Sequence, residues 1–290
     1  MNKSEKPIET EAKQESRIRI GEVYIDEGLE DIVGKAELVQ EVQKMDIEIG
    51  EYLGENENPT IYDFRIYSDR EEYESYLKTN FPDEFEGTKI DNAVFHYDKG
   101  SGEGALIAVY VEKEALDPDD PKVQEYLKEE DISFDELEAR AKSNLKNNIY
   151  PGIAHEMTHL HPFFGGVGNE ASENKWEQEM VCVFIDSKMW EKYGNDDFIE
   201  KIKLKAQEQS QEKDFYEEIK KDFQEGGFEI EEWERLFYPF LEKRYGKDKL
   251  VNFFSDLFKN KSDIEMAFKT AFGDDLKDAT KLFQEEINNN

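Results

Sequence analysis

The segment His155-Glu156-Met157-Thr158-His159 places, within one turn of helix, the side chains that bind a zinc ion and use it for hydrolysis. Histidines at positions i and i+4 lie on one face of an α-helix, with Cβ atoms about 6 Å apart. Both imidazoles can therefore reach one tetrahedral Zn²⁺ ion. The carboxylate of Glu156 would lie beside the open position of the metal, where it can take a proton from a water molecule and later pass it to a leaving amine. The segment predicts a hydrolytic metal site.

A structural pair of histidines is the alternative interpretation of the same residues. The flanking sequence favours the metal. Pro151 and Gly152 suit the opening of a helix, since proline is tolerated at the first helical position. The other positions of the turn are apolar, so we expect this helix to be buried. A buried, charged Glu156 without a partner would be strongly disfavoured, and a metal site supplies that partner.

A third protein ligand is needed, and three downstream glutamates are candidates: Glu173, Glu177 and Glu179. Residues 172–192 are expected to form one helix, which is capped by a serine and ends before a Tyr-Gly pair. Glu173 falls in its first turn, where the helix dipole already explains a carboxylate, and Glu177 falls at the edge of the apolar stripe. Glu179 lies on the stripe itself, so we choose it as the ligand. The stripe comprises Trp176, Met180, Val183, Phe184 and Trp190.

The pattern His155-Glu156-x-x-His159, followed 20 positions later by Glu179, resembles that of the gluzincin zinc metallopeptidases, the thermolysin-like group. The run from Trp176 to Phe184 also resembles their second ligand-bearing helix, W-x-x-E-G-x-A-x-[YF]. This resemblance implies His155, His159 and Glu179 as ligands of one Zn²⁺ per chain and Glu156 as the general base. It further implies hydrolysis of a peptide or protein substrate by a metal-activated water.

Three departures from the family pattern stand out. Met180 occupies a position where glycine is common, and it could crowd the cleft. Val183 stands four residues after the ligand glutamate, where thermolysin-type enzymes carry an aspartate that orients a zinc histidine. Asp186, a backbone carbonyl or no group at all would take that role. The substrate-binding Asn-Ala motif of thermolysin is absent. These departures indicate a divergent member, and they leave a catalytically silent zinc-bearing module that binds peptide or protein as the alternative function.

The expected fold class is α+β, with a polar tail over residues 1–16 and one metallopeptidase-like domain over residues 17–290. A mixed or antiparallel sheet, with helices packed on the zinc helix, is expected within residues 17–165, and a mainly helical lobe within residues 166–290. Strands are predicted over Ile18–Ile25 and Thr60–Tyr67, and a hairpin over Ala93–Tyr97 and Ala105–Val111. The last of these strands either borders the cleft with a free edge or lies inside the sheet.

Stabilisation of the reaction's oxyanion needs a donor from the helical lobe. Tyr238 is the candidate, because the following Pro239 disrupts the helix and could direct the tyrosine into the cleft. Tyr245 and Arg235 are the alternatives, and a core position is the other reading of Tyr238.

Composition limits the partners. The formal net charge of −33 argues against nucleic acid, because phosphate would be repelled, and it favours basic or neutral substrates. No apolar run is long enough to span a membrane. Cys182, the single cysteine, is read as a small core residue. The sequence as printed predicts a soluble, cytoplasmic protein, whereas a tail left after removal of an export signal would mean secretion or lipid anchoring.

Overall fold

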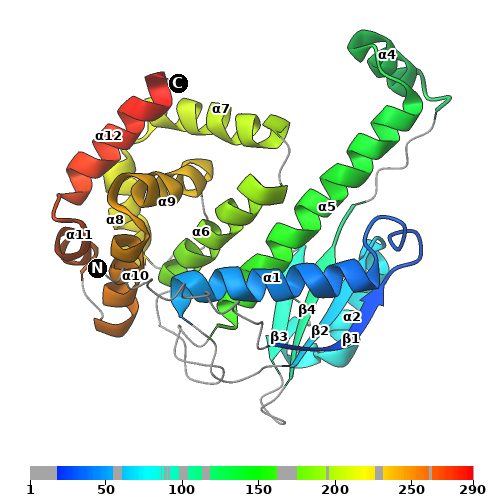
Figure 1. The fold of residues 1–290 in the computed structure, drawn as a ribbon, viewed down its shortest axis with the longest axis horizontal. Helices are drawn as coiled ribbons and strands as arrows, with labels where there is room; N and C mark the ends of the chain where they lie inside the picture. Colours follow the sequence, from blue (N-terminus) through cyan, green and yellow to red (C-terminus); the bar gives the residue numbers. More distant parts are fainter. Residues whose placement is uncertain are drawn as a thin grey trace, which may run out of the picture.

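The computed structural model describes residues 18–54, 61–85, 87, 90, 92–97, 104–112, 118–161, 175–193, 196–225, 231–260 and 263–289. Within these segments the fold is α+β, as the sequence predicts: one four-stranded mixed sheet is followed by a long series of helices. The sheet and the helical C-terminal part lie on opposite sides of a central helix pair, α5 and α6 (Figure 1). The expected tail over residues 1–16 lies outside the described residues.

The sheet has the strand order β1-β2-β4-β3. The strands are β1 (Arg19–Ile25), β2 (Ile61–Tyr67), β3 (Ala93–Tyr97) and β4 (Gly104–Tyr110). β1, β2 and β4 run parallel, and β3 pairs antiparallel to β4, as predicted for the hairpin. Because β4 is hydrogen-bonded on both sides, it is an inner strand; of the two alternatives for this strand, the position inside the sheet is confirmed and the free edge is wrong. β3 is the strand at the edge.

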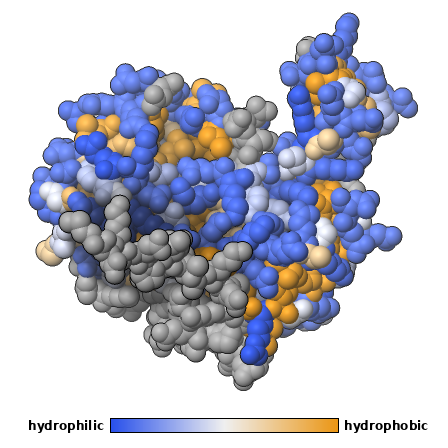
Figure 2. All heavy atoms as spheres, in the orientation of Figure 1, coloured by the Kyte–Doolittle hydropathy of each residue, from blue (hydrophilic) through white to orange (hydrophobic). Residues whose placement is uncertain are grey.

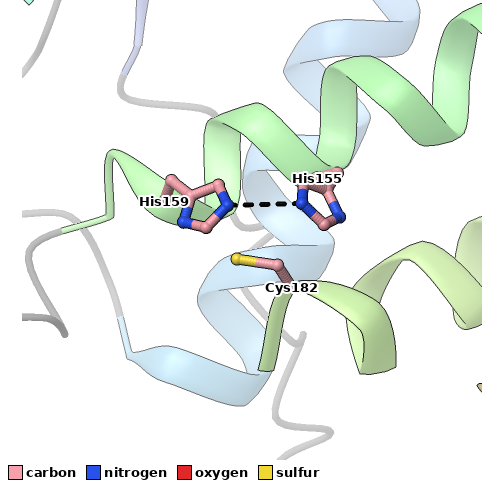
Figure 3. Close-up of side chains that lie close together, drawn as sticks. All are labelled: His155, His159 and Cys182. Atoms are coloured by element: carbon pink, nitrogen blue, oxygen red, sulfur yellow. Dashed lines mark hydrogen bonds between the residues drawn. The ribbon is translucent and has the colours of Figure 1, made fainter. Parts of the chain in front are cut away.

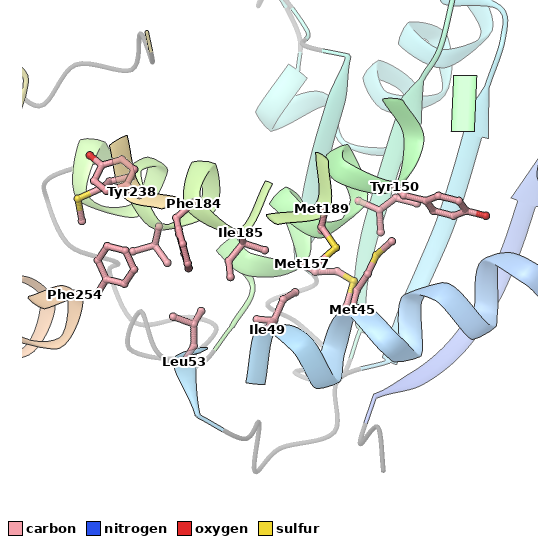
Figure 4. Close-up of a cluster of buried hydrophobic side chains, with 14 of the residues drawn as sticks. Met45, Ile49, Leu53, Tyr150, Met157, Phe184, Ile185, Met189, Tyr238 and Phe254 are labelled. Carbon is pink, nitrogen blue, oxygen red and sulfur yellow. The ribbon is translucent and has the colours of Figure 1, made fainter. Parts of the chain in front are cut away.

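Helices cover this sheet on both faces. α2 (Arg70–Asn80) and the short α3 (Pro82–Phe85) follow β2, and Tyr73 and Leu77 of α2 pack on the smaller of two apolar clusters. α1 (Lys35–Leu53) begins directly after Gly34, which stands at its N-cap. Its stripe of Met45, Ile49 and Leu53 packs against α5 and α6 in the main core (Figure 4).

The zinc-motif helix is longer than predicted. α4 (Pro121–Glu130) leads into α5 (Phe134–His159), which runs without interruption for 26 residues. Ser133 and Glu136 form a capping box at its start. Pro151 therefore does not open a new helix; it lies buried inside α5, where its missing N–H deprives the Asn147 carbonyl of its usual helical donor. Because α5 is continuous, it carries His155 and His159 on a single helix that packs between the sheet and α6.

The C-terminal part is entirely helical in the described residues. It comprises α6 (Lys175–Tyr193), α7 (Asp196–Glu212), α8 (Phe215–Glu225), α9 (Glu232–Tyr245), α10 (Lys247–Asn260), α11 (Ile264–Phe272) and α12 (Leu276–Asn289). Aromatic rings fill its interior; the Phe215 ring stacks on that of Trp233 with centroids 4.2 Å apart. The outer surface is mostly hydrophilic in the view of Figure 2. Among the described helices, none combines the length and apolar character that crossing a bilayer requires.

Candidate metal centre

α5 and α6 bring the predicted ligands together. His155 and His159 project from the last turns of α5, and their Nε2 atoms lie 3.2 Å apart. Glu179, near the start of α6, meets both rings: Oε2 lies 3.2 Å from Nε2 of His155, and Oε1 lies 3.2 Å from Nε2 of His159. Three potential donors from two helices therefore converge on one point. Of the other glutamates considered, Glu173 and the side chain of Glu177 lie outside the described residues.

These spacings fit a metal ion. In a tetrahedral zinc site with metal–ligand distances near 2.0 Å, neighbouring ligand atoms lie about 3.3 Å apart. The two histidine Nε2 atoms lie 3.2 Å apart, and Glu179 presents one carboxylate oxygen to each of them at 3.2 Å, which is close to that spacing. Two imidazoles and one carboxylate are also a donor set that zinc accepts, so the residues present fit the ion.

The electrostatics of the group favour a cation. Burial lowers the pKa of His155, but the hydrogen bond to Glu179 and the charges of Glu156 and Asp186 outweigh it and raise that pKa to about 9. Burial likewise opposes ionisation of Glu179, yet hydrogen bonds with the two histidines lower its pKa to about 2. Carboxylates thus surround the imidazoles closely enough to stabilise positive charge between them.

Cys182 also belongs to this cluster. The Sγ atom and a ring nitrogen of each histidine lie within 4.8 Å of one another, so His155, His159 and Cys182 form a group that could hold a metal ion. Figure 3 shows the thiol pointing from α6 toward the two rings. Glu179 approaches the same two histidines more closely, at 3.2 Å to each.

A cleft of about 620 Å³ opens beside the centre. His155 and Glu156 of α5 line it, and the start of β3 and the end of β4 form the opposite wall. Its volume lies in the range of sites that bind small molecules or side chains. Glu156 lines the cleft but is only 7% exposed, and it lies next to His155 in the sequence.

Sequence reasoning missed an ion pair in the same cleft. Arg235 of α9 donates a hydrogen bond to Oδ2 of Asp186 on α6, and its Nε lies 3.7 Å from Oε2 of Glu232. Both partners raise the pKa of the guanidinium above its ordinary value, although burial opposes this. The sequence did contain a signal that Asp186 lies near the centre. Cys182 and Asp186 follow Glu179 at i+3 and i+7, and residues at these spacings share one face of a helix.

The structure does not bring the predicted oxyanion donor to the cleft. Tyr238 is 2% exposed, and its ring packs against that of Phe254 in the apolar core, with centroids 6.3 Å apart (Figure 4). Tyr245, the second candidate, donates a hydrogen bond to Asp274, 2.9 Å away, and is not among the residues that line the cleft. Arg235, the third candidate, lines the cleft. Met180 is buried in the core and does not crowd the cleft.

Comparisons of the chain with protein-family models, with curated proteins and with solved structures found no match.

Proposed function

We propose that the protein is a zinc-dependent metallopeptidase of gluzincin type, which hydrolyses peptide bonds in the cleft beside α5. The observation that carries the proposal is the set of three 3.2 Å separations among His155, His159 and Glu179, with Glu156 next to them at the cleft surface. A structural histidine pair would need neither the converging carboxylate nor the adjoining cleft.

Each residue of the centre has a definite role in this proposal. His155, His159 and Glu179 hold the ion. Bound there, Zn²⁺ would polarise the scissile carbonyl and lower the pKa of a water molecule toward 7. The Glu156 carboxylate accepts the proton of the attacking water and then donates it to the leaving amine nitrogen. Its burial removes competing bulk water from that transfer.

Arg235 replaces Tyr238 as our candidate for stabilising negative charge on the substrate. It lies in the cleft wall opposite the sheet, it stays positively charged, and Asp186 fixes its orientation. A guanidinium N–H can donate to a substrate carbonyl oxygen as charge develops there. Glu112, Glu156 and Glu232 also line the cleft, so peptides with basic or neutral side chains are the favoured substrate class.

Glu156→Gln tests the mechanism. The substitution keeps the shape of the side chain and removes the base, so zinc content should stay at that of the wild type while kcat falls by about 10²–10⁴-fold. Cleavage of a mixture of unstructured peptides, followed by mass spectrometry, is the assay. Glu138→Gln is the matched control, because Glu138 lies on the same helix but pairs with Lys142 at the surface. Full activity of Glu156→Gln would refute the role of the base.

The catalytically silent zinc-bearing binding module remains the second candidate, and the proximity of Cys182 favours it. A thiolate in addition to three other ligands would resemble the closed set of a structural zinc site. This candidate predicts that the zinc-loaded protein binds peptides without cleaving them, and that Glu156→Gln binds them equally well. Turnover by the wild type would exclude it.

A further inference from the structure

Cys182 occupies the buried side of the metal centre. It lies on α6 one turn after Glu179 and is 0% exposed, whereas the side chains of His155 and Glu179 keep 20% and 16% exposure. The cleft opens on the side of His155 and Glu156. The thiol therefore faces the two histidines from the interior of the protein, and Figure 3 shows it beside both rings.

The distances leave Cys182 one small movement away from a ligand position. Zn–S and Zn–N bonds of about 2.3 and 2.05 Å place sulfur and nitrogen about 3.5 Å apart in a tetrahedral site. The Sγ atom lies within 4.8 Å of the ring nitrogens. The difference between these two separations is at most about 1.3 Å, so a small shift of the sulfur would bring it to ligand distance.

Other functions of this thiol fit the surroundings less well. Cys182 is 0% exposed, so a substrate cannot reach its sulfur for nucleophilic attack. An ordinary core cysteine would not need two imidazole nitrogens beside its sulfur. A divalent cation is the partner that accounts for thiol and imidazoles together, because metal coordination deprotonates a cysteine.

We propose that Cys182 is a fourth protein ligand of the divalent metal, bound from the buried side of the His155, His159 and Glu179 set. The inference rests on the metal centre of the proposed function. On binding, the S–H bond breaks, its proton passes to solvent and a metal–sulfur bond forms. The thiolate makes the centre prefer zinc and cobalt over magnesium, calcium and manganese, which favour oxygen ligands. With four protein ligands in place, a water molecule could bind only if the zinc became five-coordinate, so this ligand set favours the binding module over the peptidase.

Cobalt substitution tests this ligand directly. The full-length protein, stripped of metal and loaded with one equivalent of Co²⁺, is expected to show visible bands typical of a tetrahedral site and a thiolate-to-cobalt charge-transfer band in the near ultraviolet. Cys182→Ser and Cys182→Ala should lose the charge-transfer band while still binding cobalt. Zinc affinity, measured by competition with a chromophoric chelator, should fall by more than about tenfold in both variants. Ser187→Ala, a buried change on the same helix, should keep the band.

The outcomes separate this inference from the proposed function. Wild-type protein that binds cobalt with visible bands but without a charge-transfer band would overturn the role of Cys182 and leave the three-ligand peptidase site intact. An unchanged zinc affinity in Cys182→Ala would also overturn it. Wild-type protein that binds no cobalt and no zinc would overturn both. A charge-transfer band in a protein that cleaves no peptide would support the ligand and count against the peptidase.

Discussion

Breaking the ion pair between Asp186 and Arg235 should weaken both the fold and the proposed chemistry. The perturbations are Asp186→Asn, Arg235→Met and the double variant. Asp186 is 6% exposed, and its Oδ2 accepts a hydrogen bond from Arg235. The pair joins α6, which carries Glu179, to α9, so it connects the metal centre to the helical lobe.

The magnitude follows from the degree of burial. Removing one partner of a fully buried ion pair costs about 3–5 kcal/mol. Arg235 keeps 26% side-chain exposure, and Glu232 stays 3.7 Å away as an alternative partner. We therefore expect each single substitution to lower the free energy of unfolding by about 2 kcal/mol. The coupling energy from the double-mutant cycle should be about 1–2 kcal/mol.

Urea unfolding at a fixed excess of zinc measures the cycle, since any change in metal occupancy would alter the apparent stability. The exposed pair of Lys243 and Glu286, at 3.6 Å, is the control, and its coupling should be below about 1 kcal/mol. In the peptide assay, Asp186→Asn should reduce kcat/KM by about tenfold with zinc content unchanged, because Arg235 loses its orientation. Free energies of unfolding that add within about 0.5 kcal/mol would refute the reasoning.

Two further predictions concern the third ligand and the loops that join the strands. Glu179→Ala should lose or strongly loosen its zinc in elemental analysis while Glu177→Ala keeps one ion per chain; zinc retained by the first variant would move the ligand elsewhere. Although burial raises it, hydrogen bonds from Ser68 and Tyr24 hold the pKa of Asp26 below its ordinary value. Asp26→Asn should therefore cost about 2 kcal/mol of unfolding free energy at pH 7, and the difference from wild type should shrink progressively as the pH falls from about 4 through the lowered pKa of Asp26; a pH-independent difference would contradict this.

Local patterns predicted much of this molecule. Alternation of apolar residues located β1 and β2, and a glycine-containing connection between two short apolar runs located the hairpin of β3 and β4. The spacing of His155 and His159 placed both imidazoles on one helix face, and position on an apolar stripe selected Glu179. In each case the signal lies within a single element or in one short connection, so it can be read from neighbouring residues in the sequence.

Features that depend on tertiary packing were not predictable in the same way. A proline usually marks a helix start, yet Pro151 lies inside α5 because buried packing against the sheet and α6 outweighs one lost hydrogen bond. Likewise, Tyr238 precedes a proline, but the apolar core between α6 and α10 takes its ring, and Arg235 reaches the cleft instead. The strand order, which puts β4 inside the sheet, also follows from no local signal.

The position of Asp186 explains how this centre departs from the gluzincin pattern. An aspartate four residues after Glu179 would lie about one helical turn from the ligand, close enough to orient a zinc histidine, but Val183 is buried there in the core. Asp186 lies on the same face three residues further along, which is about 4.5 Å more along the helix axis. At that distance its charge still stabilises protonated His155, while its hydrogen bond goes to Arg235. The charge of Asp186 thus acts on His155 at a distance, whereas its hydrogen bond holds Arg235 in the cleft. For this reason Asp186→Asn should change turnover more than it changes zinc content.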